Sequence, residues 1–159
     1  MADDIRRFLR HVLATIAYRG GKTLRGAPDG FADARIQADT RSAVEIVAHL
    51  ADLMEWALTS VEGQAKWNPQ PPAAWQHEVD RFFAALERLD TFLAGGAPIG
   101  CPPERLFQGP LADALTHVGQ LSTLRRAAGV PVRSENFYQA PIEVGSVGPE
   151  QKPPKFEFD

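Results

Sequence analysis

Four segments in which apolar residues recur every three or four positions are the feature that most constrains how this chain folds. They cover about residues 3–19, 40–61, 75–94 and 103–128, with glycine and proline between them. This spacing lines apolar side chains along one face of an α-helix. Four such segments predict an all-α fold, a mostly antiparallel four-helix bundle over residues 1–131.

Local signals place the helix ends. The Gly-Gly pair at 20–21 predicts the end of the first helix. Ser42 and Glu45 match a capping box, in which side chains accept hydrogen bonds from free backbone N–H groups, so the second helix begins there. The Gly-Pro pair at 109–110 predicts a break and a restart in the fourth segment. The predicted core stripe of the first helix consists of Ile5, Phe8, Leu9, Val12, Leu13 and Ile16.

The last segment, residues 132–159, differs from the rest because it is rich in proline and glycine and has no helical period. We expect it to be an extended tail that packs on the bundle. Aromatic residues are scattered along it and are the predicted anchors: Phe137, Tyr138, Phe156 and Phe158. No strand pairing is predicted.

Composition excludes several classes of protein. A chain of 159 residues, 44% of them hydrophobic, suits one domain with its own core. The net charge of −3 gives no electrostatic reason to expect nucleic acid or an anionic membrane as a partner. The single cysteine, Cys101, is typical of a reducing compartment. No apolar run reaches the roughly 18–20 residues of a membrane span. We therefore expect a soluble, cytoplasmic protein.

Two histidines and a carboxylate are the candidate site. Asp113 and His117 are four residues apart on the fourth helix, so both can reach one ion. His49 lies in the middle of the second helix and completes a three-ligand set if the two helices pack together. Three protein ligands with an open position are typical of catalytic zinc, and nickel, iron or manganese also accept such ligands. Gln120 or Glu45 would orient these ligands through hydrogen bonds without contacting the metal.

A plainer interpretation of the same residues is also open. An Asp–His pair at this spacing is common on helices as a simple ion pair or hydrogen bond. In that case His49 is an ordinary surface histidine and no metal binds.

Two stretches of the sequence resemble the DinB/YfiT-like superfamily of metal-dependent enzymes. Residues 43–57 resemble the helix that carries that family's first metal histidine, here His49. Residues 113–131 resemble its H-x-x-x-H-x-G-Q helix with a closing Gly-x-Pro, with His117 at the second histidine and Asp113 in place of the first. The resemblance extends from about residue 3 to 131, and the tail lies outside it.

The resemblance implies a metal-dependent enzyme that acts on a small-molecule substrate. Relatives transfer low-molecular-weight thiols such as bacillithiol or mycothiol to electrophiles, and many are homodimers. A metal-dependent hydrolase is an alternative. Because Asp113 replaces a histidine, a second alternative is a bundle that has lost the metal and serves as a small-ligand-binding or stress-associated protein.

Overall fold

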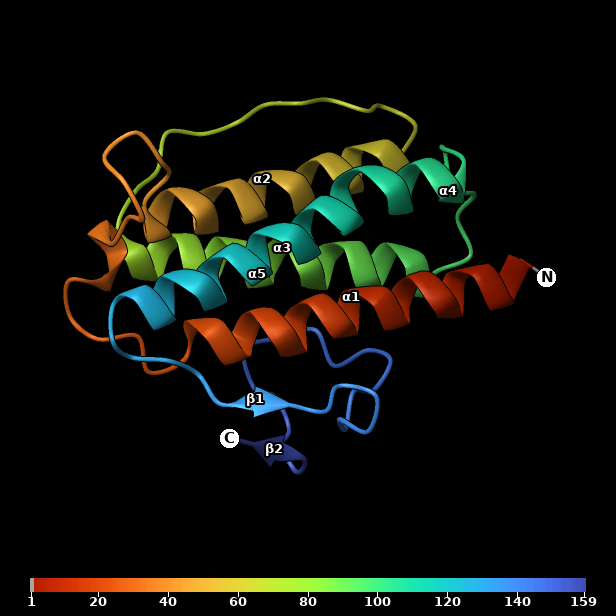
Figure 1. Ribbon diagram of the computed structural model, residues 1–159. Coiled ribbons are helices and arrows are strands. Elements are labelled where there is room, and N and C mark those ends of the chain that lie inside the picture. Colours follow the sequence, from red (N-terminus) through yellow and green to blue (C-terminus); the bar gives the residue numbers. More distant parts are fainter. Residues whose placement is uncertain (1) are drawn as a thin grey trace.

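Four long helices form the body of the computed structural model, which describes residues 2–159 (Figure 1). They are α1 (Ala2–Leu24), α2 (Ala43–Val61), α3 (Trp75–Ala94) and α5 (Ala112–Ala127). The predicted all-α fold is confirmed. Within the described residues, no helix combines the length and apolar character that a membrane crossing needs.

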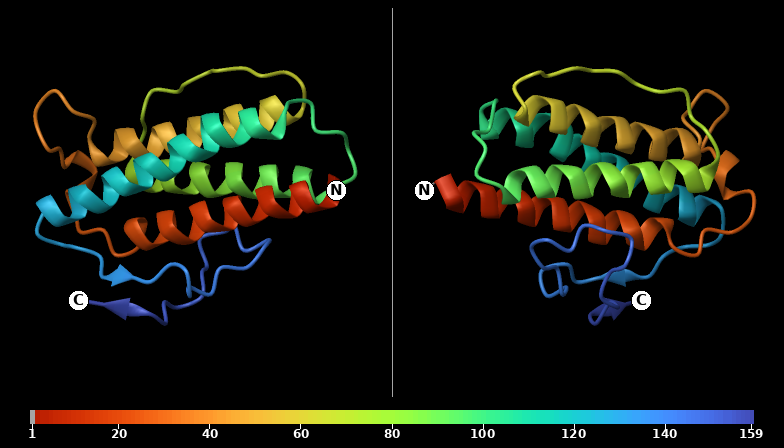
Figure 2. Two further views of the ribbon diagram at one scale, coloured as in Figure 1. Left: turned by 45° about the vertical axis from the view of Figure 1, so that its right-hand side comes forward. Right: turned by 180° about the vertical axis from the view of Figure 1, so that it is seen from behind.

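The helices form a ring in which α1 and α2 are diagonal to each other. α1 packs against α3 and α5, and α2 packs against the same two helices. The neighbours α2 and α3 run in the same direction, as do α1 and α5, so the mostly antiparallel arrangement predicted from sequence is wrong for these pairs (Figures 1 and 2).

The loop at residues 62–74 makes the parallel pair possible. It returns along the whole bundle from the end of α2 to the start of α3 (Figure 1). An extended segment of this length spans up to about 40 Å. The 19-residue helix α2 is only about 28 Å long, so the loop is long enough.

Helix α1 does not end at the glycine pair. It continues to Leu24, and the turn that follows uses Gly26 at φ +61°. A Cβ on Gly20 would lie 3.3 Å from Cε1 of Phe82. Glycine at this position therefore brings α1 close to α3 and does not break the helix. The predicted helix end at 20–21 is wrong because Gly20 is needed for the close contact with Phe82 and not for a turn.

The predicted start of α2 is confirmed. Ser42 Oγ accepts a hydrogen bond from Glu45 N at 3.4 Å, and Glu45 Oε2 accepts one from Ser42 N at 2.6 Å. Glu45 also forms an ion pair with Arg35, at 2.8 Å. The capping box therefore fixes where the helix that carries His49 begins.

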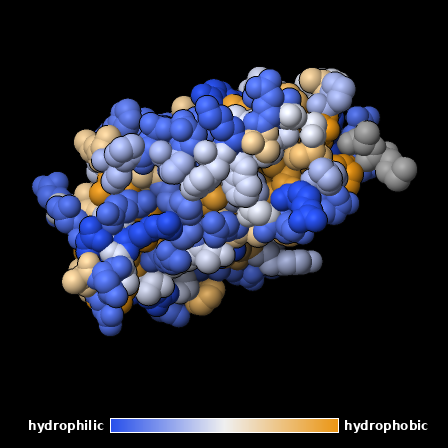
Figure 3. Space-filling model, turned by 90° about the horizontal axis from the view of Figure 1, so that it is seen from above, coloured by the Kyte–Doolittle hydropathy of each residue, from blue (hydrophilic) through white to orange (hydrophobic). Residues whose placement is uncertain are grey.

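The core lies between the helices and includes most of the predicted apolar stripe. Ile5 and Phe8 are exceptions, with exposed fractions of 38% and 55%. They lie in the first turns of α1 and line a surface hollow with Pro103 and Phe107. Phe8 contacts Phe107 there, with ring centroids 6.3 Å apart. The face shown in Figure 3 is mostly hydrophilic, with its apolar residues in separate small groups.

A short irregular stretch leads into α5. The helical turn α4 (Pro103–Leu106) passes into a π-helical turn, η2 (Phe107–Leu111), where Gly109 has non-helical angles of φ −89° and ψ −106°. The predicted break at the Gly-Pro pair is confirmed. Here the turn ends just before Asp113, the first candidate ligand on α5.

The tail runs along the bundle beside α1 (Figure 1). Its strands β1 (Ser134–Glu135) and β2 (Glu157–Phe158) pair antiparallel, although no pairing was expected. Two-residue strands are too short to show an alternating pattern in the sequence.

The anchors of the tail are not mainly its aromatic residues. Glu135 is buried and accepts hydrogen bonds from Tyr18 Oη and Lys22 Nζ, both at 2.7 Å. Val147 is also buried. Of the predicted anchors, Phe137 makes an edge contact with Tyr18, with ring centroids 6.4 Å apart. The other predicted anchors are exposed: Tyr138, Phe156 and Phe158.

Candidate metal centre

The packing of α2 against α5 brings the predicted ligands together. His49 Nε2 lies 3.5 Å from Asp113 Oδ2, and His117 Nε2 lies 3.5 Å from Asp113 Oδ1. The two imidazole rings are nearly perpendicular, at 85°, with centroids 4.5 Å apart. The carboxylate therefore sits between two imidazole nitrogens that come from different helices.

The spacing of these atoms is close to the one that a shared cation would require. A normal N–H···O bond is about 2.7–3.2 Å, shorter than either contact here. Ligands about 2.1 Å from a tetrahedral zinc ion lie roughly 3.4 Å from one another. One candidate ligand atom from each of the three residues lies within 4.8 Å of the other two, so a small closure between the histidines completes the set.

Gln120 fixes the orientation of one ligand. Its Oε1 lies 2.9 Å from His117 Nδ1. An amide oxygen can only accept, so Nδ1 carries the proton and donates it to Gln120. The lone pair of His117 is then on Nε2, the atom that faces Asp113. This is the tautomer that a metal ligand needs. The predicted neighbour of the site is present.

His49 is enclosed by aromatic rings. The Trp67 ring, from the loop that returns between α2 and α3, lies 5.7 Å from it at 77°, and Trp56 packs against Trp67 at 5.8 Å. The side chain of His49 is only 15% exposed. Burial lowers the pKa of His49, and the charge of Arg41 lowers it further, as does His117 whenever it is protonated, against the opposing effect of Asp113. The lowered pKa favours the neutral imidazole, the form that binds a metal.

The cluster opens toward solvent on the side of Asp113, which is 47% exposed. His117 lines a pocket of about 580 Å³ that also includes Ile36, Arg41 and Ile46. Asp113 lines a second hollow of about 380 Å³, next to Trp56. A small molecule can therefore approach the cluster from the surface.

Glu45 has a different surrounding from the one expected. Its carboxylate is engaged by Ser42 and Arg35 at the start of α2. The structure therefore shows Glu45 contacting the helix terminus and not the histidines.

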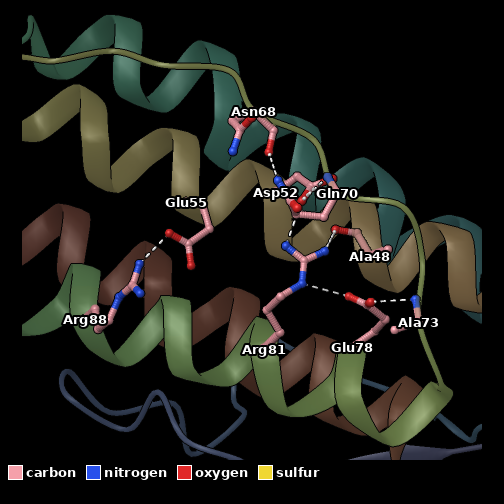
Figure 4. A network of polar contacts seen from close by, with 9 residues as sticks. All are labelled: Ala48, Asp52, Glu55, Asn68, Gln70, Ala73, Glu78, Arg81 and Arg88. Atoms are coloured by element: carbon pink, nitrogen blue, oxygen red, sulfur yellow. Dashed lines mark hydrogen bonds and ion pairs between the residues drawn. The ribbon is translucent and has the colours of Figure 1, made fainter.

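A second polar cluster lies between α2 and α3 (Figure 4). Arg81 donates from Nη1 to Asp52 Oδ1 at 2.7 Å, from Nε to Glu78 Oε2 at 2.8 Å, and from Nη2 to the carbonyl of Ala48 at 3.0 Å. Asp52 and Glu78 are buried, at 5% and 1% exposed. They also accept from the backbone N–H groups of Gln70 and Ala73, which pins the returning loop that carries Trp67.

Most residues around the candidate ligands could not be identified from the sequence. Trp56 lies seven positions after His49, two turns along the same helix face, and this spacing is a usable signal. Trp67 lies in a proline-rich loop whose return path has no pattern. Arg41 precedes the capping box and reaches the pocket only because the loop before α2 folds there.

Comparison with known protein families, with curated proteins and with solved structures found no match to this chain.

Proposed function

We propose that this chain is a metal-dependent enzyme whose divalent transition metal is held by His49, Asp113 and His117. The observation that carries the proposal is the placement of both histidine Nε2 atoms 3.5 Å from the two oxygens of one carboxylate, beside an open pocket. Two imidazoles and one carboxylate with a free position form the donor set of a catalytic centre. Zinc and nickel are the first candidates, followed by iron and manganese.

The protein's own residues prepare the site for a cation. Gln120 holds the proton of His117 on Nδ1 and leaves Nε2 free to coordinate. Asp113 supplies a negative charge that offsets part of the charge of a divalent ion. Trp67 covers His49 and limits the access of water from that side.

The pocket beside His117 is of the size that binds small molecules. Its apolar residues Ile36 and Ile46 suit the body of a substrate, and Arg41 places a positive charge at the same pocket. When bound, a divalent metal lowers the pKa of a coordinated thiol or water, and so supplies a nucleophile at neutral pH. We propose transfer of a small thiol to an electrophile as the reaction, with hydrolysis as the outcome if water is used instead.

Metal analysis of the purified, tag-free protein tests the centre. We expect about one transition metal per chain, and loss of that metal in His49→Ala and in His117→Ala. His77→Ala is the matched control, because His77 is an exposed histidine on α3. Metal-free wild type that stays metal-free after incubation with zinc and nickel contradicts the proposal.

An activity screen then distinguishes the reactions. Electrophiles and esters are offered to the metal-loaded protein with and without added thiol. Turnover that requires both thiol and His49 supports transfer, whereas turnover independent of thiol identifies a hydrolase. Metal binding without turnover of either class favours the non-catalytic alternative.

A further inference from the structure

A second pocket, lined by cationic side chains, lies away from the metal centre, between α1, α5 and the tail. Its volume is about 190 Å³. Four basic residues line it, contributed by three parts of the chain: Arg19, Lys22, Arg126 and Arg133. Thr23, Ser122 and Ser134 also line it, and the Thr23 hydroxyl donates to the carbonyl of Gly20 at 2.7 Å. The chain as a whole carries a net charge of −3, so this group of cations stands out from its surroundings.

The lining of this pocket contains one carboxylate, Glu135, and its charge does not repel a bound anion. The Glu135 side chain is 0% exposed, and its two oxygens accept from Tyr18 Oη and Lys22 Nζ. Both oxygens are therefore engaged within the protein. Outside the lining, Glu157 pairs with Lys22 at 2.7 Å and with Arg133 at 3.6 Å.

Two of the four cations have no carboxylate partner among the described residues. The guanidinium carbon of Arg19 lies 4.4 Å above the centre of the Phe137 ring. Arg126 donates only a long hydrogen bond, 3.4 Å, to Ser134 Oγ. Each guanidinium thus keeps most of its N–H donors available, and its planar fork suits two oxygens of a single anion.

We propose that this pocket binds the phosphate group of a small phosphomonoester, with Arg19 and Arg126 as its main ligands. Phosphate is favoured over a carboxylate because two guanidinium groups, the third proton of Lys22 and the Ser122 hydroxyl together offer donors to more than two oxygens. The volume admits one phosphate group and a few attached atoms, but no polymer. The proposal is independent of the metal centre.

Calorimetric titration of the full chain with inorganic phosphate, at constant ionic strength, tests this site. We expect one saturable site per chain. Arg126→Gln and Arg19→Gln should each weaken binding about tenfold or more, the loss of one charge-assisted hydrogen-bonded ligand. The matched control is Arg105→Gln, an exposed arginine on α4 at the other end of the molecule, which should bind as wild type does.

Competing anions complete the test. Chloride that displaces phosphate at equal ionic strength, or Arg105→Gln that weakens binding as much as Arg126→Gln, overturns the proposal, because the effect is then general screening. Succinate that binds as tightly as phosphate with the same dependence on Arg126 overturns the assignment to phosphate. Far-ultraviolet circular dichroism of each variant verifies folding, and Ser122→Ala gives a weaker loss without removing a charge.

Discussion

Two polar clusters on either side of α2 contain similar groups but differ in how their contacts are completed. On the side of α3, Arg81 binds Asp52 and Glu78 through hydrogen bonds of 2.7–2.8 Å. On the side of α5, His49 and His117 stay 3.5 Å from Asp113. The first cluster completes its hydrogen bonds within the protein and holds two helices and a loop together. The second leaves its donor atoms without bonds of normal length to one another, as the proposed metal centre requires.

The largest expected effect comes from breaking the cluster of Arg81, Asp52 and Glu78, which we call the closed cluster. Arg81→Ala leaves two buried carboxylates without their cation, so we expect a loss of about 3 kcal/mol in the free energy of unfolding. Urea denaturation measures this loss. Because the network also pins the loop of Trp67, the variant should bind metal more weakly as well.

The matched control is Arg88→Ala on the same helix. Arg88 pairs with Glu55 between the same two helices, but the two side chains are 54% and 38% exposed. An exposed pair of this kind contributes about 0–1 kcal/mol. Equal losses in the two variants would contradict the contrast between a closed and an exposed contact.

The cluster of His49, Asp113 and His117, which we call the open cluster, should stabilise the protein only when it binds a metal ion. Metal at about 100 times its Kd raises the free energy of unfolding by roughly 2.7 kcal/mol. Asp113→Asn should abolish most of that gain. In metal-free protein the same variant should differ from wild type by no more than about 0.5 kcal/mol, since Asp113 is half exposed and bonded to neither histidine at normal length. A large loss in metal-free Asp113→Asn would show that the cluster is structural.

The smallest effect is a dependence on pH. Because the pKa of His49 is lowered in the folded protein, the unfolded chain binds the proton more readily. Stability should therefore be full above the ordinary histidine pKa of about 6.5 and should fall as the pH drops from there toward the lowered value. One proton limits the slope to about 1.4 kcal/mol per pH unit.

Thermal unfolding of metal-free wild type and His49→Gln between pH 5 and 8 measures the contribution of His49 to the pH dependence of stability. We expect the difference between the two to change in favour of the variant as the pH falls. A difference that is constant with pH would show that His49 titrates normally.

The helices were predictable because their signals are local. The capping box of Ser42 and Glu45 and the Gly-Pro break at 109–110 depend on neighbouring residues only, and both were found as predicted. The pair at 20–21 was misjudged because its role is to contact Phe82, more than 60 positions away. Helix direction was misjudged for the same reason, since the path of a long loop has no local pattern.

The proximity of the three candidate ligands was predictable for two different reasons. Asp113 and His117 share a helix face by their spacing, whereas His49 joins them only because α2 packs on α5. The two apolar stripes of α2 predicted that this helix packs against more than one neighbour. The family resemblance then indicated that the helix with Asp113 and His117 is one of them. Trp67 and Arg81 could not be assigned, because their roles depend on where the returning loop lies.

The most direct measurement is a metal-anomalous diffraction map from crystals grown with zinc or nickel. One peak about 2.0–2.2 Å from His49 Nε2, His117 Nε2 and an oxygen of Asp113 is the expected result. Metal found elsewhere, or imidazoles of residues 49 and 117 that remain without a shared ion in saturating metal, would contradict the claim that the open cluster on α2 is a metal centre.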